Sequence, residues 1–388
     1  MTTVAVPATD DVLGAARALL PGLLDLTEAI ARIPAPTGDE FARARHIAGV
    51  LAGSAGPGGE VHGPDGLGNV WATIGDPELV PSVVLAAHTD TVFAAGTDLL
   101  IHRDETRLHG AGIGDNSLGV AAMLTLPALF RRLGVTPDGP VVLAAPVGEE
   151  GLGNLVGIRA IMDRFPTARN MVAIEGHNLG RVTYAAVGSR RIEVVVEGPG
   201  GHSWGDYGRS SAIHVLGNLI ASVSAIRVPN RPKTTLNVGM IDGGISINTI
   251  APRASMLIDM RSLDADSLDD LSRKVMARLV STAPGITVVT RVLGERPAGH
   301  VDPDAPIVRT AKRVLSGLGQ EAILDASSTD ANIAISRGIP AICIGLTTGG
   351  NVHRTDEWVG VDQIPIGLSQ LALLTLHLAA GTEEVSRS

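Results

Sequence analysis

Aromatic residues and cysteine are scarce in this sequence. Four Phe, three Trp and two Tyr make up 2% of the 388 residues, so the core has to be built from aliphatic side chains. The single cysteine, Cys343, lies in a short apolar segment that we interpret as a buried strand. One cysteine can form neither an intramolecular disulfide nor a thiolate metal cluster. With 45% hydrophobic and 18% charged residues, the composition is that of a globular protein with a large core.

Long basic runs and long apolar runs are missing as well. A net charge of −9 without any Lys/Arg-rich segment argues against a nucleic-acid partner. No apolar run approaches the ~18 residues that a membrane-spanning helix needs, and residues 1–4 lack the basic and apolar blocks of a signal peptide. We therefore expect a cytoplasmic protein without a membrane or nucleic-acid partner.

Short apolar runs alternate with helical periodicity over most of the chain. Continuous apolar runs that we interpret as strands cover residues 83–87, 141–145, 171–174 and 341–345. Helical periodicity covers residues 11–33, 41–51, 118–133, 307–315 and 364–378. This alternation indicates βαβ units and a mixed, largely parallel sheet covered on both faces. Pro21 is expected to break the first helix or to start a new one.

The pattern changes in the middle of the chain. Strand, helix, strand, strand, helix and strand are predicted there at residues 191–196, 210–223, 236–241, 254–260, 268–279 and 287–292. A β-α-β-β-α-β order fits a small ferredoxin-like α+β module. Because 388 residues exceed one ordinary domain, we predict an α/β domain in two parts, 1–187 and 298–388, interrupted by an inserted domain at 188–297.

Two adjacent glutamates, Glu149 and Glu150, directly follow the apolar run at 141–145. Neighbouring carboxylates repel each other, and a solvated turn would be the ordinary explanation for such a pair taken alone. At the end of a buried strand, however, a cation must face the pair, or one of the two must be protonated or act as a base. The pair therefore indicates chemistry only if other functional groups lie near it.

Such groups stand at the ends of other predicted elements: His88, Asp115, Glu175 and His353. Ligands of open α/β sheets bind at the carboxyl ends of the strands, where these side chains would meet. Histidine and carboxylate ligands without cysteine suit zinc, with cobalt or manganese as alternatives. Five ligands are too many for one catalytic zinc and suit two metals ~3.5–4 Å apart that share a carboxylate. Asp90 is placed to accept the second imidazole N–H of His88.

The motifs together resemble one known enzyme family. The runs 88–92, 112–116 and 149–151, with Glu175 and His353, are similar to the dinuclear-zinc family of aminoacylase, glutamate carboxypeptidase, acetylornithine deacetylase, succinyl-diaminopimelate desuccinylase and peptidase T. The match runs in order over almost the whole chain. The resemblance implies a zinc-exopeptidase-like α/β catalytic domain, interrupted by a ferredoxin-like lid and dimerisation domain.

The resemblance also implies the roles of the metal ligands. One metal would be bound by His88, Asp115 and Glu175, and the other by Asp115, Glu150 and His353. Asp115 would then bridge two divalent metal ions, zinc by preference.

Further roles follow from the same resemblance. Glu149 would be the general base, which takes a proton from water and passes it to the leaving amine. His202, in a Gly-Gly-His-Ser run, would stabilise the oxyanion from a partner subunit, which implies a homodimer through the inserted domain. Asn248 and Arg261 would bind a substrate carboxylate, although a surface ion pair is the ordinary alternative for Arg261. Ala251 departs from the family pattern, which has proline near this position.

The resemblance leaves the substrate open. Glu175 stands where di- and tripeptidases of the family often have Asp, which favours a carboxypeptidase or an N-acyl amino acid hydrolase. An aminopeptidase of the peptidase T type, acting on di- and tripeptides, is the main alternative. A catalytically silent binding protein is a third, although no predicted ligand and no predicted base has been lost.

Overall fold

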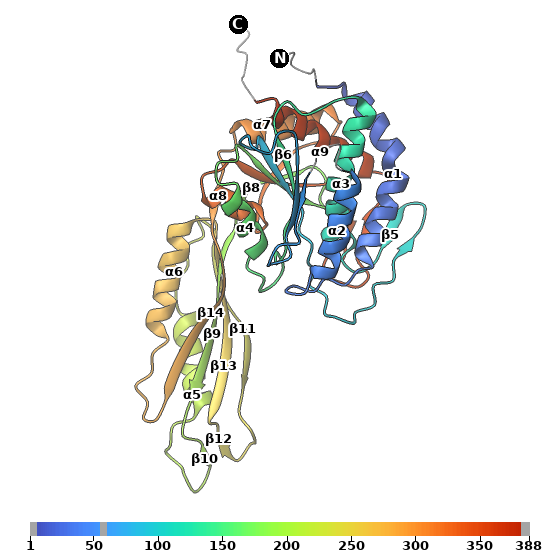
Figure 1. Ribbon diagram of the computed structural model, residues 1–388. Coiled ribbons are helices and arrows are strands. Elements are labelled where there is room, and N and C mark those ends of the chain that lie inside the picture. Colours follow the sequence, from blue (N-terminus) through green and yellow to red (C-terminus); the bar gives the residue numbers. More distant parts are fainter. Residues whose placement is uncertain (1–5, 55–59, 382–388) are drawn as a thin grey trace. The chain divides into compact units, whose positions relative to one another are not determined.

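The computed structural model describes residues 6–54 and 60–381 and divides the chain into two compact units (Figure 1). Unit 1 contains the described residues up to Ala185 and from His300 onward, and unit 2 contains Ala186–Gly299. The units divide after Ala185 and after Gly299. The domain borders predicted from the sequence, after residues 187 and 297, each lie two residues away.

A nine-stranded mixed sheet forms the centre of unit 1. In spatial order its strands are β1 (Val61–His62), β2 (Val70–Ile74), β6 (Val141–Ala145), β3 (Val83–Ala86), β7 (Met171–Glu175), β17 (Ala341–Gly345), β8 (Arg181–Ala186) and β15 (Gly299–His300), with β16 (Ile323–Ser327) beside β8. The four central strands β6, β3, β7 and β17 are parallel, whereas β2 and β8 pair with them in antiparallel orientation. This confirms the prediction of a mixed, largely parallel sheet.

Helices cover this sheet on both faces. They are α1 (Thr9–Ala31), α2 (Phe41–Ser54), α3 (Gly119–Leu133), α4 (Val156–Arg164), α7 (Pro306–Gly317), α8 (Ala331–Ser336) and α9 (Ile364–Ala379). Leu85, Val172 and Ile342 belong to one aliphatic core together with α1, α3, α7 and α9. Because side chains alternate along a strand, the residues next to them in sequence face the opposite side of the sheet. There α8 packs on β7 and β17 and contacts α4.

A second, small sheet and a helical turn lie beside these layers. The small sheet consists of β4 (His102–Arg103), β5 (Arg107–His109), β18 (Gly349–Gly350) and β19 (Trp358–Gly360). The turn η1 (Ile113–Leu118) leads directly into α3. By length and by a mean hydropathy of 1.3, residues 113–133 could cross a membrane, but 78% of the apolar window is buried, as in a core helix.

The first helix does not break at Pro21, so this expectation was wrong. Helix α1 continues from Thr9 to Ala31 with Pro21 inside it. Its buried residues Ala16, Leu23 and Leu24 lie on both sides of the proline, and the helix packs against α3 and α9. Tertiary packing of an apolar helix face therefore outweighs the hydrogen bond that the proline removes.

The substitution Pro21→Ala is expected to raise the free energy of unfolding by about 2 kcal/mol. Proline inside a helix destabilises the folded state by ~3 kcal/mol relative to alanine. Alanine, however, leaves the unfolded chain more conformational freedom, which reduces this gain in stability by up to ~1 kcal/mol. Pro306 at the start of α7 is the matched control, because a proline in the first helical turn breaks no hydrogen bond. Urea unfolding checks both variants, and equal effects of Pro21→Ala and Pro306→Ala would contradict the explanation.

Unit 2 has the predicted β-α-β-β-α-β order. Its main elements are β9 (Gly188–Glu197), α5 (Ala212–Ser224), β11 (Thr234–Gly243), β13 (Arg253–Ser262), α6 (Ala265–Arg278) and β14 (Thr287–Arg296). The strands form an antiparallel sheet in the order β11-β13-β9-β14, which is the ferredoxin-like arrangement. Alternate residues of β13 are buried against α5 and α6. A short ladder of β10 (Gly201–His202) and β12 (Thr249–Ile250) is also present.

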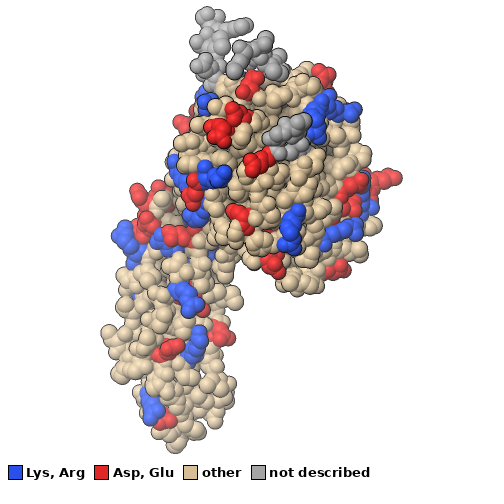
Figure 2. Space-filling model, in the orientation of Figure 1, with Lys and Arg blue, Asp and Glu red and all other residues tan. Residues whose placement is uncertain are grey.

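Charged side chains of both signs are mixed on one face of the molecule (Figure 2). On the face drawn in Figure 2, Lys and Arg are interspersed with Asp and Glu, and no continuous basic patch covers it.

Candidate metal centre

Three neighbouring strands of unit 1 end beside one another in acid or imidazole side chains. His88 follows β3, Glu149 and Glu150 follow β6, and Glu175 is the last residue of β7. Because β6, β3 and β7 are adjacent and parallel, their carboxyl ends meet at one edge of the sheet.

Two loops add Asp115 and His353 to this edge. Asp115 lies in η1, and His353 lies in a turn after β18 with a positive φ of 66°. The Oδ1 atom of Asp115 is 3.0 Å from Nε2 of His88, and its Oδ2 atom is 3.1 Å from Nε2 of His353. Asp115 therefore faces one imidazole with each of its oxygens.

The five side chains form two groups that share Asp115. The ligand atoms of His88, Asp115 and Glu175 lie within 4.8 Å of one another, and so do those of Asp115, Glu150 and His353. Nε2 of His88 is 3.7 Å from Oε2 of Glu175, and Nε2 of His353 is 3.3 Å from Oε1 of Glu150. These are the two sets that the family resemblance implies. Such nitrogen and oxygen donors suit zinc.

The protonation equilibria of the five groups depend on one another. Burial raises the pKa of Glu150 to about 7, and the negative charge of Asp115 adds to the rise. Burial also raises the pKa of Glu175. For Asp115, burial is outweighed by hydrogen bonds with His353 and His88, which lower its pKa. The hydrogen bond with Asp115, together with the charge of Glu150, raises the pKa of His353 to about 9.

These shifts reveal an excess of negative charge at the centre. Burial lowers the pKa of His88, but the charge of Glu175 and hydrogen bonds with carboxylates hold it well above its usual value. Both imidazoles therefore attract protons, while the carboxyl groups of Glu150 and Glu175 still resist ionisation. A divalent cation in each ligand group would supply the missing positive charge, so the residues fit two such ions.

The carboxylate of Asp90 holds the turn that bears both glutamates. Its Oδ1 accepts the N–H of Glu149 at 2.9 Å, and its Oδ2 accepts the N–H of Glu150 at 2.8 Å. Thr37 Oγ1 donates a third hydrogen bond at 2.8 Å. The contact with His88 suggested by the sequence is longer: Asp90 Oδ1 lies 3.5 Å from Nδ1, and the main-chain carbonyl of Asp90 lies at 3.1 Å. The side chain of Asp90 thus primarily orders the turn.

Arg43 of α2 fixes the main chain between His88 and Asp90. Although charged, it is only 1% exposed. Its guanidinium donates to the carbonyl of Ile33 at 3.0 and 2.7 Å and to that of Thr89 at 2.9 Å. Burial lowers the pKa of Arg43 to about 10, although the negative charge of Asp90 acts to raise it.

Comparison with known proteins decides the family. The family model described as Peptidase family M20/M25/M40 matches residues 84–377, which is most of the chain. The chain belongs to this family. With its candidate ligand groups, the M20 protein is a metal-dependent hydrolase.

Relatives of this M20 hydrolase span nearly its full length. Succinyl-diaminopimelate desuccinylase from Paracoccus denitrificans is 26% identical over 375 residues, 89% of this chain and 95% of the relative. The desuccinylase from Corynebacterium glutamicum is 28% identical over 354 residues, 87% and 92% of the two chains. The structure of aminopeptidase PepT from Bacillus cereus has a TM-score of 0.76 at 20% identity, over 93% and 99% of the chains, and supports the fold.

Two other predicted site residues of the M20 hydrolase, His202 and Asn248, lie together in unit 2. His202 is exposed and pairs with Thr249 across the ladder of β10 and β12. Its Nδ1 accepts the N–H groups of Trp204 and Gly205, both at 3.2 Å, which leaves the ring proton on Nε2. The carbonyl of Asn248 accepts the N–H that follows His202 in the chain at 2.9 Å.

Arg261 does not join this pair within one chain. It is eight residues along β13 from Arg253, a distance of roughly 26 Å at the usual rise per residue. Its Nε donates to Oδ2 of Asp259 at 2.8 Å, the ion-pair alternative noted from the sequence. The extended strand therefore keeps Asn248 and Arg261 of one chain apart, and their binding of a substrate carboxylate stays a prediction.

Sequence reasoning missed Thr37, Arg43 and Glu357. A charged residue beside the apolar stripe of a helix could have indicated the burial of Arg43. Glu357 gives no such signal, because its hydrogen-bonded partners in the Asp115 segment are 242 to 245 residues away in the sequence.

Replacing Asp90 by Asn is expected to lower the free energy of unfolding of the metal-free M20 hydrolase by about 2–3 kcal/mol. The new amide cannot accept both N–H groups of the Glu149–Glu150 turn, and it leaves one buried donor unpaired. Thr37→Val removes only the third hydrogen bond and should cost ~1 kcal/mol. Urea titration gives both values. A loss for Asp90→Asn that is no larger than for Thr37→Val would contradict the role of the carboxylate.

Proposed function

We propose that this M20 hydrolase cleaves the amide or peptide bond of a small substrate that bears a carboxylate, namely an N-acyl amino acid or a dipeptide, in the manner of a carboxypeptidase or aminoacylase. The observation that supports this most directly is the pair of three-residue ligand groups that share Asp115, with Glu149 beside them.

Two divalent metal ions, zinc by preference and cobalt or manganese as alternatives, are the proposed cofactors. His88, Asp115 and Glu175 would hold one, and Asp115, Glu150 and His353 the other. When bound, such ions polarise an amide carbonyl and lower the pKa of water. Their positive charge would also offset the burial and the negative charge of Asp115, which together raise the pKa values of Glu150 and Glu175.

Glu149 is the proposed general base. It is 7% exposed, and a carboxylate oxygen lies within 4.8 Å of ligand atoms of His88 and Glu150. Because Asp90 fixes its main-chain N–H, the carboxylate has a defined position at the ligand cluster. Glu149 takes a proton from the attacking water and passes it to the leaving amine, while Glu150 remains a ligand.

The nature of the relatives supports the substrate class. The desuccinylases, by their names, remove a succinyl group from an amino acid derivative, and they match this chain at 26–28% identity over most of both lengths. Further relatives are named as probable carboxypeptidases at 28% identity. A peptidase T-like aminopeptidase is the second candidate. Its support is the fold similarity at 20% identity, which does not extend to the substrate.

Glu149→Gln is expected to lower kcat by at least ~10² while two metal ions remain bound, because the amide cannot accept the proton of water. Turnover is measured on a panel of N-acyl amino acids, dipeptides and tripeptides with zinc, cobalt or manganese. Metal content is measured by elemental analysis. Full activity of the variant would contradict the role of Glu149. A wild-type protein that cleaves no member of the panel would instead favour a binding protein.

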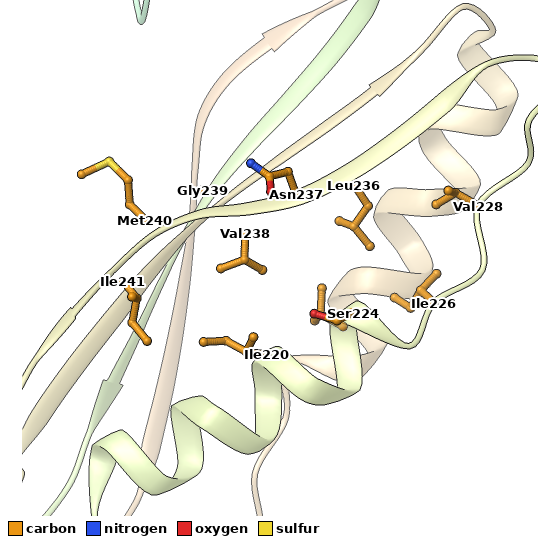
Figure 3. A pocket seen from close by; sticks show the side chains of 11 residues that line it. Ile220, Ser224, Ile226, Val228, Leu236, Asn237, Val238, Gly239, Met240 and Ile241 are labelled. Atoms are coloured by element: carbon orange, nitrogen blue, oxygen red, sulfur yellow. The ribbon is translucent and has the colours of Figure 1, made fainter.

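A homodimer through unit 2 is the proposed assembly. Strand β11 lies at the edge of its sheet, and its second half is exposed over Gly239–Gly243. Figure 3 shows Ile220 of α5 and Val238 and Ile241 of β11 around an apolar groove of about 560 Å³. A long, apolar, unpaired edge strand is a template for pairing with another chain. A second copy would offer the same edge and the same groove.

His202 is the proposed oxyanion donor in this dimer, contributed to the site of the partner. The two main-chain N–H groups that bind its Nδ1 leave Nε2–H free to donate to a substrate oxygen. This tautomer supports the role, because a neutral imidazole with its proton on Nε2 already is a hydrogen-bond donor.

Ile241→Lys is expected to convert the dimer into monomers, because it places a charge in the apolar groove. Turnover should fall about 10²-fold, since the partner's oxyanion donor is lost with the partner. Val289→Lys on β14, the other edge of the sheet, is the matched control and should change neither property. Light scattering and kinetics check this. A dimer that persists contradicts the interface, and a fully active monomer contradicts the action of His202 on the partner.

A further inference from the structure

Two buried side chains outside the ligand groups connect the loops that bear the predicted ligands. Glu357 is 0% exposed and follows His353 by four residues. His177 is 6% exposed and follows Glu175 by two residues. Nε2 of His177 lies 2.6 Å from Oε1 of Glu357, so the two form a short, buried hydrogen bond.

Both carboxylate oxygens of Glu357 bind the main chain of the Asp115 segment. Oε2 accepts the N–H of Gly112 at 2.9 Å. Oε1 accepts the N–H of Gly114 at 3.0 Å and that of Asp115 at 2.9 Å. Hydrogen bonds to an ionised acceptor in a buried site are the stronger kind. These three fix the backbone from which the Asp115 side chain projects.

The ring of His177 fits tightly between two glycines. A Cβ atom at Gly114 would lie 2.2 Å from its Nε2, and one at Gly349 would lie 2.2 Å from its Nδ1. Nδ1 has no hydrogen-bond partner among the described residues. We therefore assign the ring proton to Nε2, which faces Glu357, because a buried N–H without an acceptor is costly. The ring thus separates the Asp115 segment from β18, the strand before His353.

We propose that Glu357 and His177 are positioning residues for Asp115, the ligand that both metal groups share. The inference rests on the proposed function, because it takes Asp115 as that shared ligand. A carboxylate that serves two cations must be correctly placed relative to both, yet Asp115 lies in a glycine-rich loop. The buried pair supplies the rigidity that this loop lacks.

The test compares Glu357→Gln with Asp65→Asn. The carboxamide of Glu357→Gln keeps one acceptor oxygen but cannot accept all three N–H groups of the Asp115 segment. Asp65 is the matched control: its Oδ1 also accepts three main-chain N–H groups, those of Leu67, Gly68 and Asn69, each at 2.9 Å, in a loop without a predicted ligand.

Three readouts are expected to change in Glu357→Gln and not in Asp65→Asn. Amide hydrogen exchange of the metal-free protein should become faster over residues 112–118. The affinity for zinc, measured by calorimetric titration, should fall about 10–100-fold, as for other groups that orient metal ligands. The visible absorption spectrum of the cobalt-loaded protein should shift, because the ligand geometry is altered.

A second variant protects the test against misfolding of the first. His177→Ala removes the ring but leaves the three hydrogen bonds from the Asp115 segment, so it should change the same readouts by a smaller amount, up to ~10-fold in zinc affinity. Wild-type exchange, affinity and spectrum in a folded Glu357→Gln, or in His177→Ala if the former does not fold, would overturn the proposal. If the wild-type chain binds neither zinc, cobalt nor manganese, the proposed function fails, and hydrogen exchange alone decides whether Glu357 orders the segment.

Discussion

The repulsion among closely spaced carboxylates at one sheet edge is the constraint on which unit 1 depends. Strands that meet there are ended or followed by Asp90, Glu149, Glu150 and Glu175, and η1 adds Asp115. Main-chain N–H groups stabilise the negative charge of Asp90. The imidazoles of His88 and His353 stabilise that of Asp115. Burial and the charge of Asp115 still raise the pKa values of Glu150 and Glu175, and divalent cations would neutralise the charge that remains.

Much of this arrangement could be predicted because it is local in sequence. Strands β6 and β17 have the residues expected from their apolar runs, and the parallel order of the central strands follows from their alternation with helices. Side chains directly after parallel strands meet by geometry alone, so His88 and Glu175 could be placed at one edge without coordinates. The helix through Pro21 could not be foreseen, because packing from α3 and α9 decides it.

The supporting contacts could not be predicted because they join distant segments. The carboxylate of Asp90 binds amides 59 and 60 residues away, and Glu357 binds amides more than 240 residues away. No periodicity links such positions. In the same way, the separation of Asn248 from Arg261 follows from the length of an extended strand, which motif matching does not measure.

The interval between His353 and Glu357 has a consequence for how this loop can vary. One end presents an imidazole to Asp115, and the other end is buried under the Asp115 segment. Between them, Arg354 and Asp356 form an exposed bidentate ion pair. Exposed loops ordinarily tolerate insertions at little cost. Here the three intervening residues act as a spacer of fixed length, so an insertion would draw either His353 away from Asp115 or Glu357 out of its buried position.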